Sequence, residues 1–396
     1  MAIYDGAGNK IRRNALCPCG SKRKFKHCHG KETAQGLLGS ADDVAGFLEK
    51  NFYKARANRV AFEEKHGRVN PIISGHFRDW RFVAVGDELH YSKIAETKYF
   101  PDFLMNYIGS KLGSEWGMSE LEKPIKDRHP ALKWHDSLSR FQKNEKPDED
   151  GVYRSSGNGS LVSWYRLAYD LYLLKHNADL QERLLNRIRN RAQFQGARFE
   201  LFVAASMIVA GFEIAFEDEA DSTCKHTEFL ATHCSGMRIA VEAKSRHRDG
   251  VLEYRAPPRR SGKDQCSRVG VEGLIRKALA KDPDTPYFIF IDLNLPYLDA
   301  NLDAQPWLQE INETVRKVLR DWLPGKFPAN AIFFCNDPTY QSPEIPPEEN
   351  SFLCYTVEID TPRHPLADQQ IIRHVAQSIM RRNNIPNEFP EQETLT

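Results

Sequence analysis

The chain has 396 residues, a formal net charge of +1 and 41% hydrophobic residues. This length predicts two or three domains rather than one, and the composition is that of an ordinary soluble protein with a sizeable core. A near-neutral charge neither supports nor excludes nucleic-acid binding, because local patches decide it.

Cysteine usage and apolar stretches predict the compartment. Three of the 8 cysteines belong to one motif near the start, and the others are scattered. This pattern is typical of reduced thiols in a cytoplasmic protein rather than of a disulfide framework. Residues 1–10 contain no apolar run of the kind that a signal peptide needs. The longest apolar stretch, residues 201–210, is too short to span a bilayer, so we expect no membrane segment.

Residues 17–30 read Cys-Pro-Cys-Gly-Ser-Lys-Arg-Lys-Phe-Lys-His-Cys-His-Gly. Their spacing predicts a zinc site with Cys17, Cys19, Cys28 and His29 as ligands. Three thiolates and an imidazole close a tetrahedral site of the structural kind, which leaves no position for a reactive water. A segment this short buries little apolar surface, so its folding must come largely from metal binding.

This stretch resembles the SEC-C motif, first known from the C-terminal tail of the preprotein translocase ATPase. The flanking Pro, Gly, Ser and Phe residues match as well, but Lys22 stands where the family usually has Gly. That departure predicts a local change in the loop without loss of a ligand. The resemblance implies a protein partner or a ribosome. Because the segment is basic, contact with phosphates is an alternative, and a solvated tag without a partner is another.

We expect three parts along the chain: the zinc motif and a linker at residues 1–40, a mostly helical middle region at 41–162, and a third part at 163–396. In the middle region, residues 41–64 and 100–112 and the stretch after Trp116 read as helical, and residues 81–92 alternate around Gly86-Asp87, which predicts a β-hairpin. Residues 143–159 are charged and then rich in Ser and Gly, which indicates an exposed loop. We find no motif with chemistry in this region.

The third part opens with leucines at helical spacing, and residues 196–208 are predicted to be a helix that carries Glu200 into the core. Arg187 lies on the preceding helix, where neighbouring arginines fall on different faces, so a solvated helix is favoured over a phosphate clamp. Residues 246–263 are rich in charge and Pro, and they predict a basic loop long enough to cross a substrate.

Alternating elements follow to the end of the chain. Residues 287–293 form a nearly continuous apolar run, as expected for a strand buried on both faces. Further strands are predicted at 329–335 and 352–359, and helices at 271–281, 307–322 and 366–382. The predicted fold class is therefore α/β (α+β), a mixed β-sheet flanked by helices.

Between these elements, residues 226–244 predict a second β-hairpin, with Ser235-Gly236 as its turn. If the turn centres near Ser235, Glu228 falls opposite Glu242, at about 4.5–5.5 Å between Cβ atoms. Lys244 shares a face with Glu242 because the two are two residues apart on a strand. Clustered carboxylates are costly unless a cation joins them. Hard divalent cations such as Mg2+ take these oxygen ligands.

The Glu-Ala-Lys at the end of an apolar strand, with an acidic residue one strand earlier, resembles the PD-(D/E)xK restriction-endonuclease-like superfamily. The Gly-Ala-Arg-Phe-Glu at residues 196–200 is similar to the start of that family's first core helix. The implied order is a helix with Glu200, a strand near 212–216, a strand with Glu228 and a strand with Glu242 and Lys244. The first acid of the family's pattern is usually Asp after Pro, whereas here Glu228 follows Thr227. Asp218 and Asp221 are alternatives for that role.

The resemblance implies phosphodiester hydrolysis by an endonuclease that uses Mg2+ or Mn2+. Glu228, Glu242 and the carbonyl of Ala243 would hold the metal, Lys244 would orient or help deprotonate the water, and Glu200 would complete the metal shell or anchor Lys244. DNA is favoured over RNA as the nucleic-acid substrate, and the family implies a homodimer and a role in antiviral defence against foreign DNA. Two alternatives stay open, a catalytically inactive adapter that binds protein or a ribosome through the zinc motif, and an RNA-processing nuclease.

Overall fold

The computed structural model describes residues 14–16, 22–24, 56–144, 146, 158–217, 226–247, 252, 269–295, 305, 307–339 and 352–390. Within these residues, no helix is both long enough and apolar enough to cross a membrane. Two compact units are present, Met1–Glu64 and Lys65–Thr396. In the first unit, Leu16 and Lys24 form an antiparallel bridge, which brings together the two described pieces of the SEC-C-like segment.

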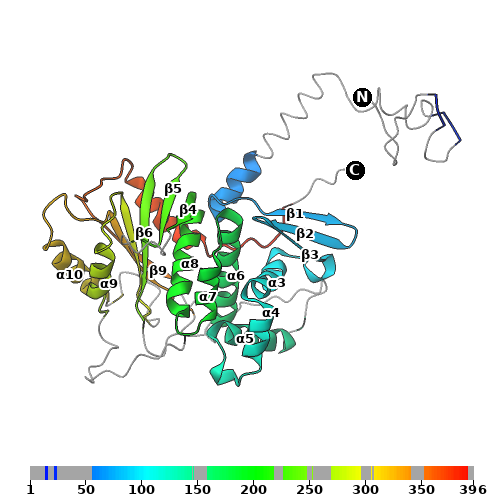
Figure 1. Cartoon of the computed structure of the whole chain (residues 1–396), viewed down its shortest axis with the longest axis horizontal. Helices are drawn as coiled ribbons and strands as arrows, with labels where there is room; N and C mark the ends of the chain where they lie inside the picture. Colours follow the sequence, from blue (N-terminus) through cyan, green and yellow to red (C-terminus); the bar gives the residue numbers. More distant parts are fainter. Residues whose placement is uncertain are drawn as a thin grey trace. The chain divides into compact units, whose positions relative to one another are not determined.

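A mixed six-stranded sheet dominates the second unit, in the order β4-β5-β6-β7-β8-β9 (Figure 1). The strands are β4 (Phe212–Phe216), β5 (Phe229–His233), β6 (Arg238–Ser245), β7 (Tyr287–Asp292), β8 (Ala331–Asn336) and β9 (Leu353–Glu358). Strands β6, β7 and β8 run parallel, whereas β4, β5 and β9 pair antiparallel with their neighbours. The central strands β7 and β8 are buried at every residue, as their continuous apolar sequences predicted.

Helices cover both faces of this sheet, as Figure 1 shows. One face packs against α9 (Glu272–Leu279) and α10 (Trp307–Leu319), around side chains such as Ile289 and Ile332. The other face carries α8 (Phe194–Val209) and α11 (Gln370–Arg381). The predicted mixed sheet flanked by helices is therefore confirmed.

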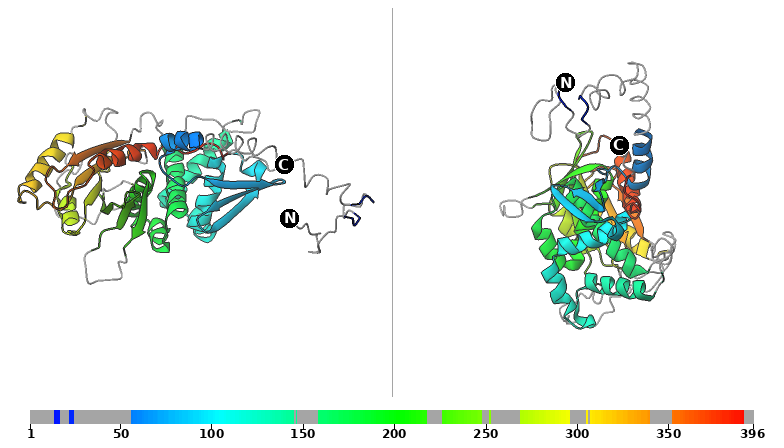
Figure 2. Two further views of the ribbon diagram at one scale, coloured as in Figure 1. Left: turned by 90° about the horizontal axis from the view of Figure 1, so that it is seen from above. Right: turned by 90° about the vertical axis from the view of Figure 1, so that its right-hand side faces the viewer.

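The remainder of the second unit consists of helices and a small sheet. The helices are α3 (Phe100–Leu112), α4 (Ser114–Leu121), α5 (Pro130–Asn144), α6 (Gly159–Asn177) and α7 (Glu182–Arg189). Helix α6 packs on α3 and α5 and also on α8, so it joins this region to the larger sheet. In Figure 2 the two sheets lie apart, with α6 and α8 between them.

The small sheet has three antiparallel strands, β1 (Ile73–Phe77), β2 (Trp80–Val85) and β3 (Glu88–Lys93). The hairpin predicted around Gly86-Asp87 is confirmed, because Val85 pairs with Glu88 and Gly86 has a φ of 59°. Strand β1 was not predicted. Its Ser-Gly-His interior breaks the alternation of apolar and polar residues on which the sequence argument relied.

Several predicted segments and site residues lie outside the described residues. The charged segment at 143–159 and the basic loop at 246–263 lie mostly outside them, as do Asp218, Asp221 and the four predicted zinc ligands. Of the helix predicted at residues 41–64, the described part is helical from residue 56.

Candidate active site

The β5–β6 hairpin places two glutamates opposite each other, as the turn position predicted. Phe229 pairs with Val241, and the next pair in this register is Glu228 with Glu242. The amide of Glu228 donates to the carbonyl of Val241 at 3.0 Å, so the pairing continues past the end of β5. Gly236 in the turn has a φ of 83°, a conformation that glycine adopts without steric cost.

Lys244 bridges these two carboxylates. Its Nζ forms an ion pair with Oε1 of Glu242 and lies 3.3 Å from Oε1 of Glu228. The Glu242 side chain is 0% exposed, whereas Glu228 and Lys244 retain 16% and 24% exposure. The cluster therefore opens to solvent on the side of Glu228 and Lys244 and is closed around Glu242.

Helix α8 adds Glu200 to the cluster. Glu200 Oε2 lies 2.6 Å from Nη1 of Arg187, which belongs to α7. Burial raises the pKa of Glu200 to about 7, and the nearby Glu228 carboxylate adds to the rise while Arg187 and Lys244 oppose it. The structure thus brings together all four residues proposed for catalysis. The sequence favoured a solvated helix over a phosphate clamp for Arg187 and did not predict its pairing with Glu200.

Burial also dominates the ionisation of Glu242. It raises the pKa of this carboxyl to about 7, against the opposing effect of Lys244. For Lys244, burial lowers the pKa, but Glu242 and Glu228 together outweigh it and the net shift is upward. At neutral pH the lysine is therefore an ammonium, while Glu242 and Glu200, each with a pKa of about 7, are present in both the protonated and the ionised form.

The donor set fits a hard divalent cation. Oε2 of Glu242 is buried and accepts no hydrogen bond from any described residue. Such an orphaned carboxylate oxygen is costly unless a cation or donor joins it. Within the described parts of the chain, no group of three or more His, Cys, Asp or Glu side chains is arranged to hold a metal ion. Glu228 and Glu242 thus form a two-carboxylate site whose negative charge the single Lys244 ammonium offsets only in part.

Sequence reasoning missed the buried network next to this cluster. Ser245, which follows Lys244, donates to Oδ2 of Asp292 at 3.1 Å, and Nη2 of Arg198 lies 3.3 Å from the same oxygen. Burial raises the pKa of Asp292 to about 6. This network joins the end of β6 to β7 and to α8, two residues before Glu200. The sequence does contain one signal for this network, because Asp292 is an acidic residue inside the apolar run of residues 287–293.

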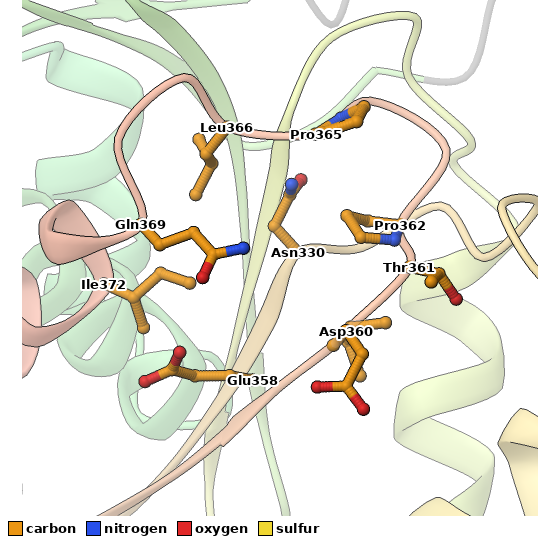
Figure 3. A pocket seen from close by; sticks show the side chains of 10 residues that line it. Asn330, Glu358, Asp360, Thr361, Pro362, Pro365, Leu366, Gln369 and Ile372 are labelled. Atoms are coloured by element: carbon orange, nitrogen blue, oxygen red, sulfur yellow. The ribbon is translucent and has the colours of Figure 1, made fainter.

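A separate hollow lies at the start of β8 and the end of β9. Its volume is about 240 Å3, and Figure 3 shows Asn330, Glu358 and Gln369 around it. None of the four clustered residues lines it. This hollow is therefore not part of the candidate active site.

Comparison with known proteins identifies one part of the chain. The SEC-C motif matches residues 13–31. Protein translocase subunit SecA of Chloroflexus aurantiacus is 38% identical over 66 residues, which is 16% of this chain and 7% of that protein. The same subunit of Dechloromonas aromatica is 72% identical over 25 residues, 6% of this chain and 3% of that protein. The chain therefore carries a SEC-C motif and spans only a small part of these relatives.

No solved structure matches the chain. In the SEC-C segment, Lys22 has a φ of 56°, a left-handed conformation that favours glycine. Lys22 therefore holds a backbone conformation that glycine would adopt with less strain.

Proposed function

We propose that this chain is a metal-dependent nuclease that hydrolyses phosphodiester bonds, with DNA as its substrate. One observation carries the proposal: the β5–β6 hairpin and α8 gather Glu228, Glu242, Lys244 and Glu200 into one half-buried cluster. Two carboxylates with an adjacent lysine suit a site where a cation and an anionic phosphate meet. A defensive role against foreign DNA is the biological setting that we propose for it.

The order of elements supports a restriction-endonuclease-like core. Helix α8 is followed by β4, β5 and β6, and then by α9 and the parallel strand β7. This is the order expected from the residues around Glu200, Glu228 and Glu242. Glu242 and Lys244 lie on β6, the strand of the hairpin that also pairs with β7 and is therefore interior to the sheet.

Each residue has a role that its surroundings support. Glu228 and Glu242 would hold Mg2+ or Mn2+, which when bound polarises the phosphoryl group and lowers the pKa of a coordinated water. Lys244, charged at neutral pH, would stabilise negative charge that develops on the phosphate. Glu200, with a pKa of about 7, is suited to take up a proton from the attacking water near neutral pH. Arg187 would hold the Glu200 side chain in place.

The SEC-C motif would supply a structural zinc site. We propose Cys17, Cys19, Cys28 and His29 as its ligands, because three thiolates and an imidazole complete a tetrahedral shell. The surrounding basic residues would let this zinc knuckle contact a protein partner or phosphates.

A cleavage assay tests the nuclease proposal. Double-stranded DNA, single-stranded DNA and RNA would be incubated with the full-length, zinc-loaded chain and Mg2+ or Mn2+. Wild type would be compared with Glu242→Gln, Lys244→Met and the control Glu213→Gln, whose side chain is exposed on β4 of the same sheet. We expect cleavage to be lost in the first two variants and with chelator, and kept in the control. Equal activity in all four proteins would overturn the proposal.

The SEC-C match favours one other candidate, a non-catalytic adapter. In that case the clustered carboxylates would be an ion-paired scaffold, and the zinc knuckle would capture a protein or a ribosome. Absence of cleavage on every substrate, together with capture of a partner that is lost in Cys28→Ser, would support the adapter. RNA cleavage instead of DNA cleavage would keep the chemistry and change the substrate.

A further inference from the structure

The small sheet β1–β2–β3 leaves one face open to solvent. Five large apolar side chains on this face are exposed: Ile73, Phe77, Trp80, Leu89 and Tyr91 at 56%, 64%, 37%, 63% and 69%. The opposite face is closed, because Val83 and Val85 are buried and His90 contacts the rings of Phe103 and Tyr107 in α3. Exposed apolar side chains gathered on one face mark an interaction site rather than scattered surface residues.

The aromatic members lie together at one end of the face. Phe77 pairs with Trp80 across β1 and β2, and Trp80 pairs with Lys93 across β2 and β3. Tyr91 is the diagonal neighbour of Trp80, with ring centroids 5.9 Å apart in an edge-to-face arrangement. Phe77, Trp80 and Tyr91, here named the aromatic platform, therefore present ring surfaces from all three strands.

Positive charge borders the aromatic platform. The guanidinium of Arg78 lies 5.2 Å from the centroid of the Phe77 ring, and Lys93 is exposed at the end of β3. In the turn after β1, Asp79 is also exposed. The acidic residue of β3, Glu88, is on the other face of the sheet and pairs with Lys111 and Lys175. The face itself thus combines aromatic rings with a lysine and carries no carboxylate.

We infer that the aromatic platform binds single-stranded nucleic acid, with bases stacked on its rings and phosphates near Arg78 and Lys93. Unpaired bases stack on aromatic side chains with little sequence preference, and cations beside them bind the backbone. Arg78 and Lys93 beside the rings complement the negative charge of a phosphate backbone, and this charge complementarity favours a nucleic-acid occupant. A duplex hides its base faces and suits this platform less well.

This inference names a substrate class for the nuclease proposed above, and delivery of the bound strand to the cluster rests on that function. Binding of a single strand to the aromatic platform does not depend on the nuclease function. It can be measured in EDTA, where no metal-dependent cleavage occurs, so failure of one proposal is separable from failure of the other.

Fluorescence anisotropy with labelled oligothymidylate and oligouridylate tests the platform. The key variant is the double substitution Phe77→Ala and Tyr91→Ala. The matched controls are Tyr91→Phe, which keeps the ring, and Leu323→Ala, which removes a side chain that is 73% exposed elsewhere in the same unit. Because all these side chains are solvent-exposed, we expect every variant to fold, and circular dichroism would check this.

We expect the double variant to weaken binding by about 100-fold, since each lost stack costs about tenfold or more. Tyr91→Phe and Leu323→Ala should bind like wild type, and a duplex should bind more weakly than either single strand. Equal binding by wild type and the double variant, or no binding by wild type, would overturn the inference. A wild-type dimer that the double variant abolishes in sedimentation, without oligonucleotide binding, would assign the platform to protein contact instead.

Discussion

Replacing Glu242 by glutamine should make the metal-free protein more stable while abolishing cleavage. The Glu242 side chain is 0% exposed, and burial raises its pKa from 4.5 to about 7. A raised pKa means that the folded state binds the proton more tightly than the unfolded chain, so the ionised carboxylate destabilises the fold. At about 1.4 kcal/mol for each tenfold change in the proton equilibrium, the difference amounts to about 3 kcal/mol above about pH 7. This figure already contains the favourable contact with Lys244, which lowers the pKa.

Urea unfolding in EDTA, followed by circular dichroism, measures this effect. At pH 8 the Glu242→Gln variant should be more stable than wild type by about 3 kcal/mol. The difference should shrink as the pH falls through about 7 and vanish below about 4.5, where the wild-type carboxyl is protonated in both states. The control Glu213→Gln should stay within about 0.5 kcal/mol of wild type at every pH. A Glu242→Gln variant less stable than wild type at pH 8, or a gap that widens toward low pH, would refute the reasoning.

Three further predictions follow from particular residues. The initial rate of cleavage should rise as the pH increases through about 7, because Glu242 must lose its proton to bind the metal and Glu200 must lose its proton to accept one from water. A cleavage rate that does not change with pH would contradict this prediction. Lys22→Gly should tighten zinc binding by about fivefold in a chelator competition, because it removes the strain of about 1 kcal/mol that a lysine has in the left-handed conformation. Weaker zinc binding by this variant would contradict the prediction. Gly67→Ala should lower the free energy of unfolding by about 2 kcal/mol or more, because Gly67 has a φ of 83° and an added Cβ would lie 2.4 Å from the carbonyl oxygen of Val209. The control Gly109→Ala lies in α3, where an added Cβ meets nothing within 4 Å, and it should raise the free energy of unfolding by up to about 1 kcal/mol. Equal effects of Gly67→Ala and Gly109→Ala in urea unfolding would contradict the prediction.

Local periodicity was sufficient to predict the hairpin and the placement of its charged residues. The Ser235-Gly236 turn set the register, and the two-residue repeat of a strand then placed Glu242 and Lys244 on the same face as Glu228. The buried strands β7 and β8 were predicted because their apolar runs leave no polar face. These predictions depend only on residues close together in the sequence.

Contacts between distant segments could not be predicted in this way. Arg187 reaches Glu200 because α7 packs on α8, and Arg198 reaches Asp292 because α8 packs on the sheet. Neither packing geometry is encoded in a local pattern. The aromatic platform was missed for a related reason, because β1 is recognisable only once β2 and β3 are seen to pair beside it.

Binding of Mn2+ to the zinc-loaded, full-length chain at pH 8, measured by isothermal titration calorimetry, tests the central claim most directly. If Glu228 and Glu242 form a metal site, wild type and Glu213→Gln should bind Mn2+ alike, and Glu242→Gln should lose that binding. Identical Mn2+ binding by wild type and Glu242→Gln, or none by wild type, would contradict the assignment of this cluster as a metal-dependent nuclease centre.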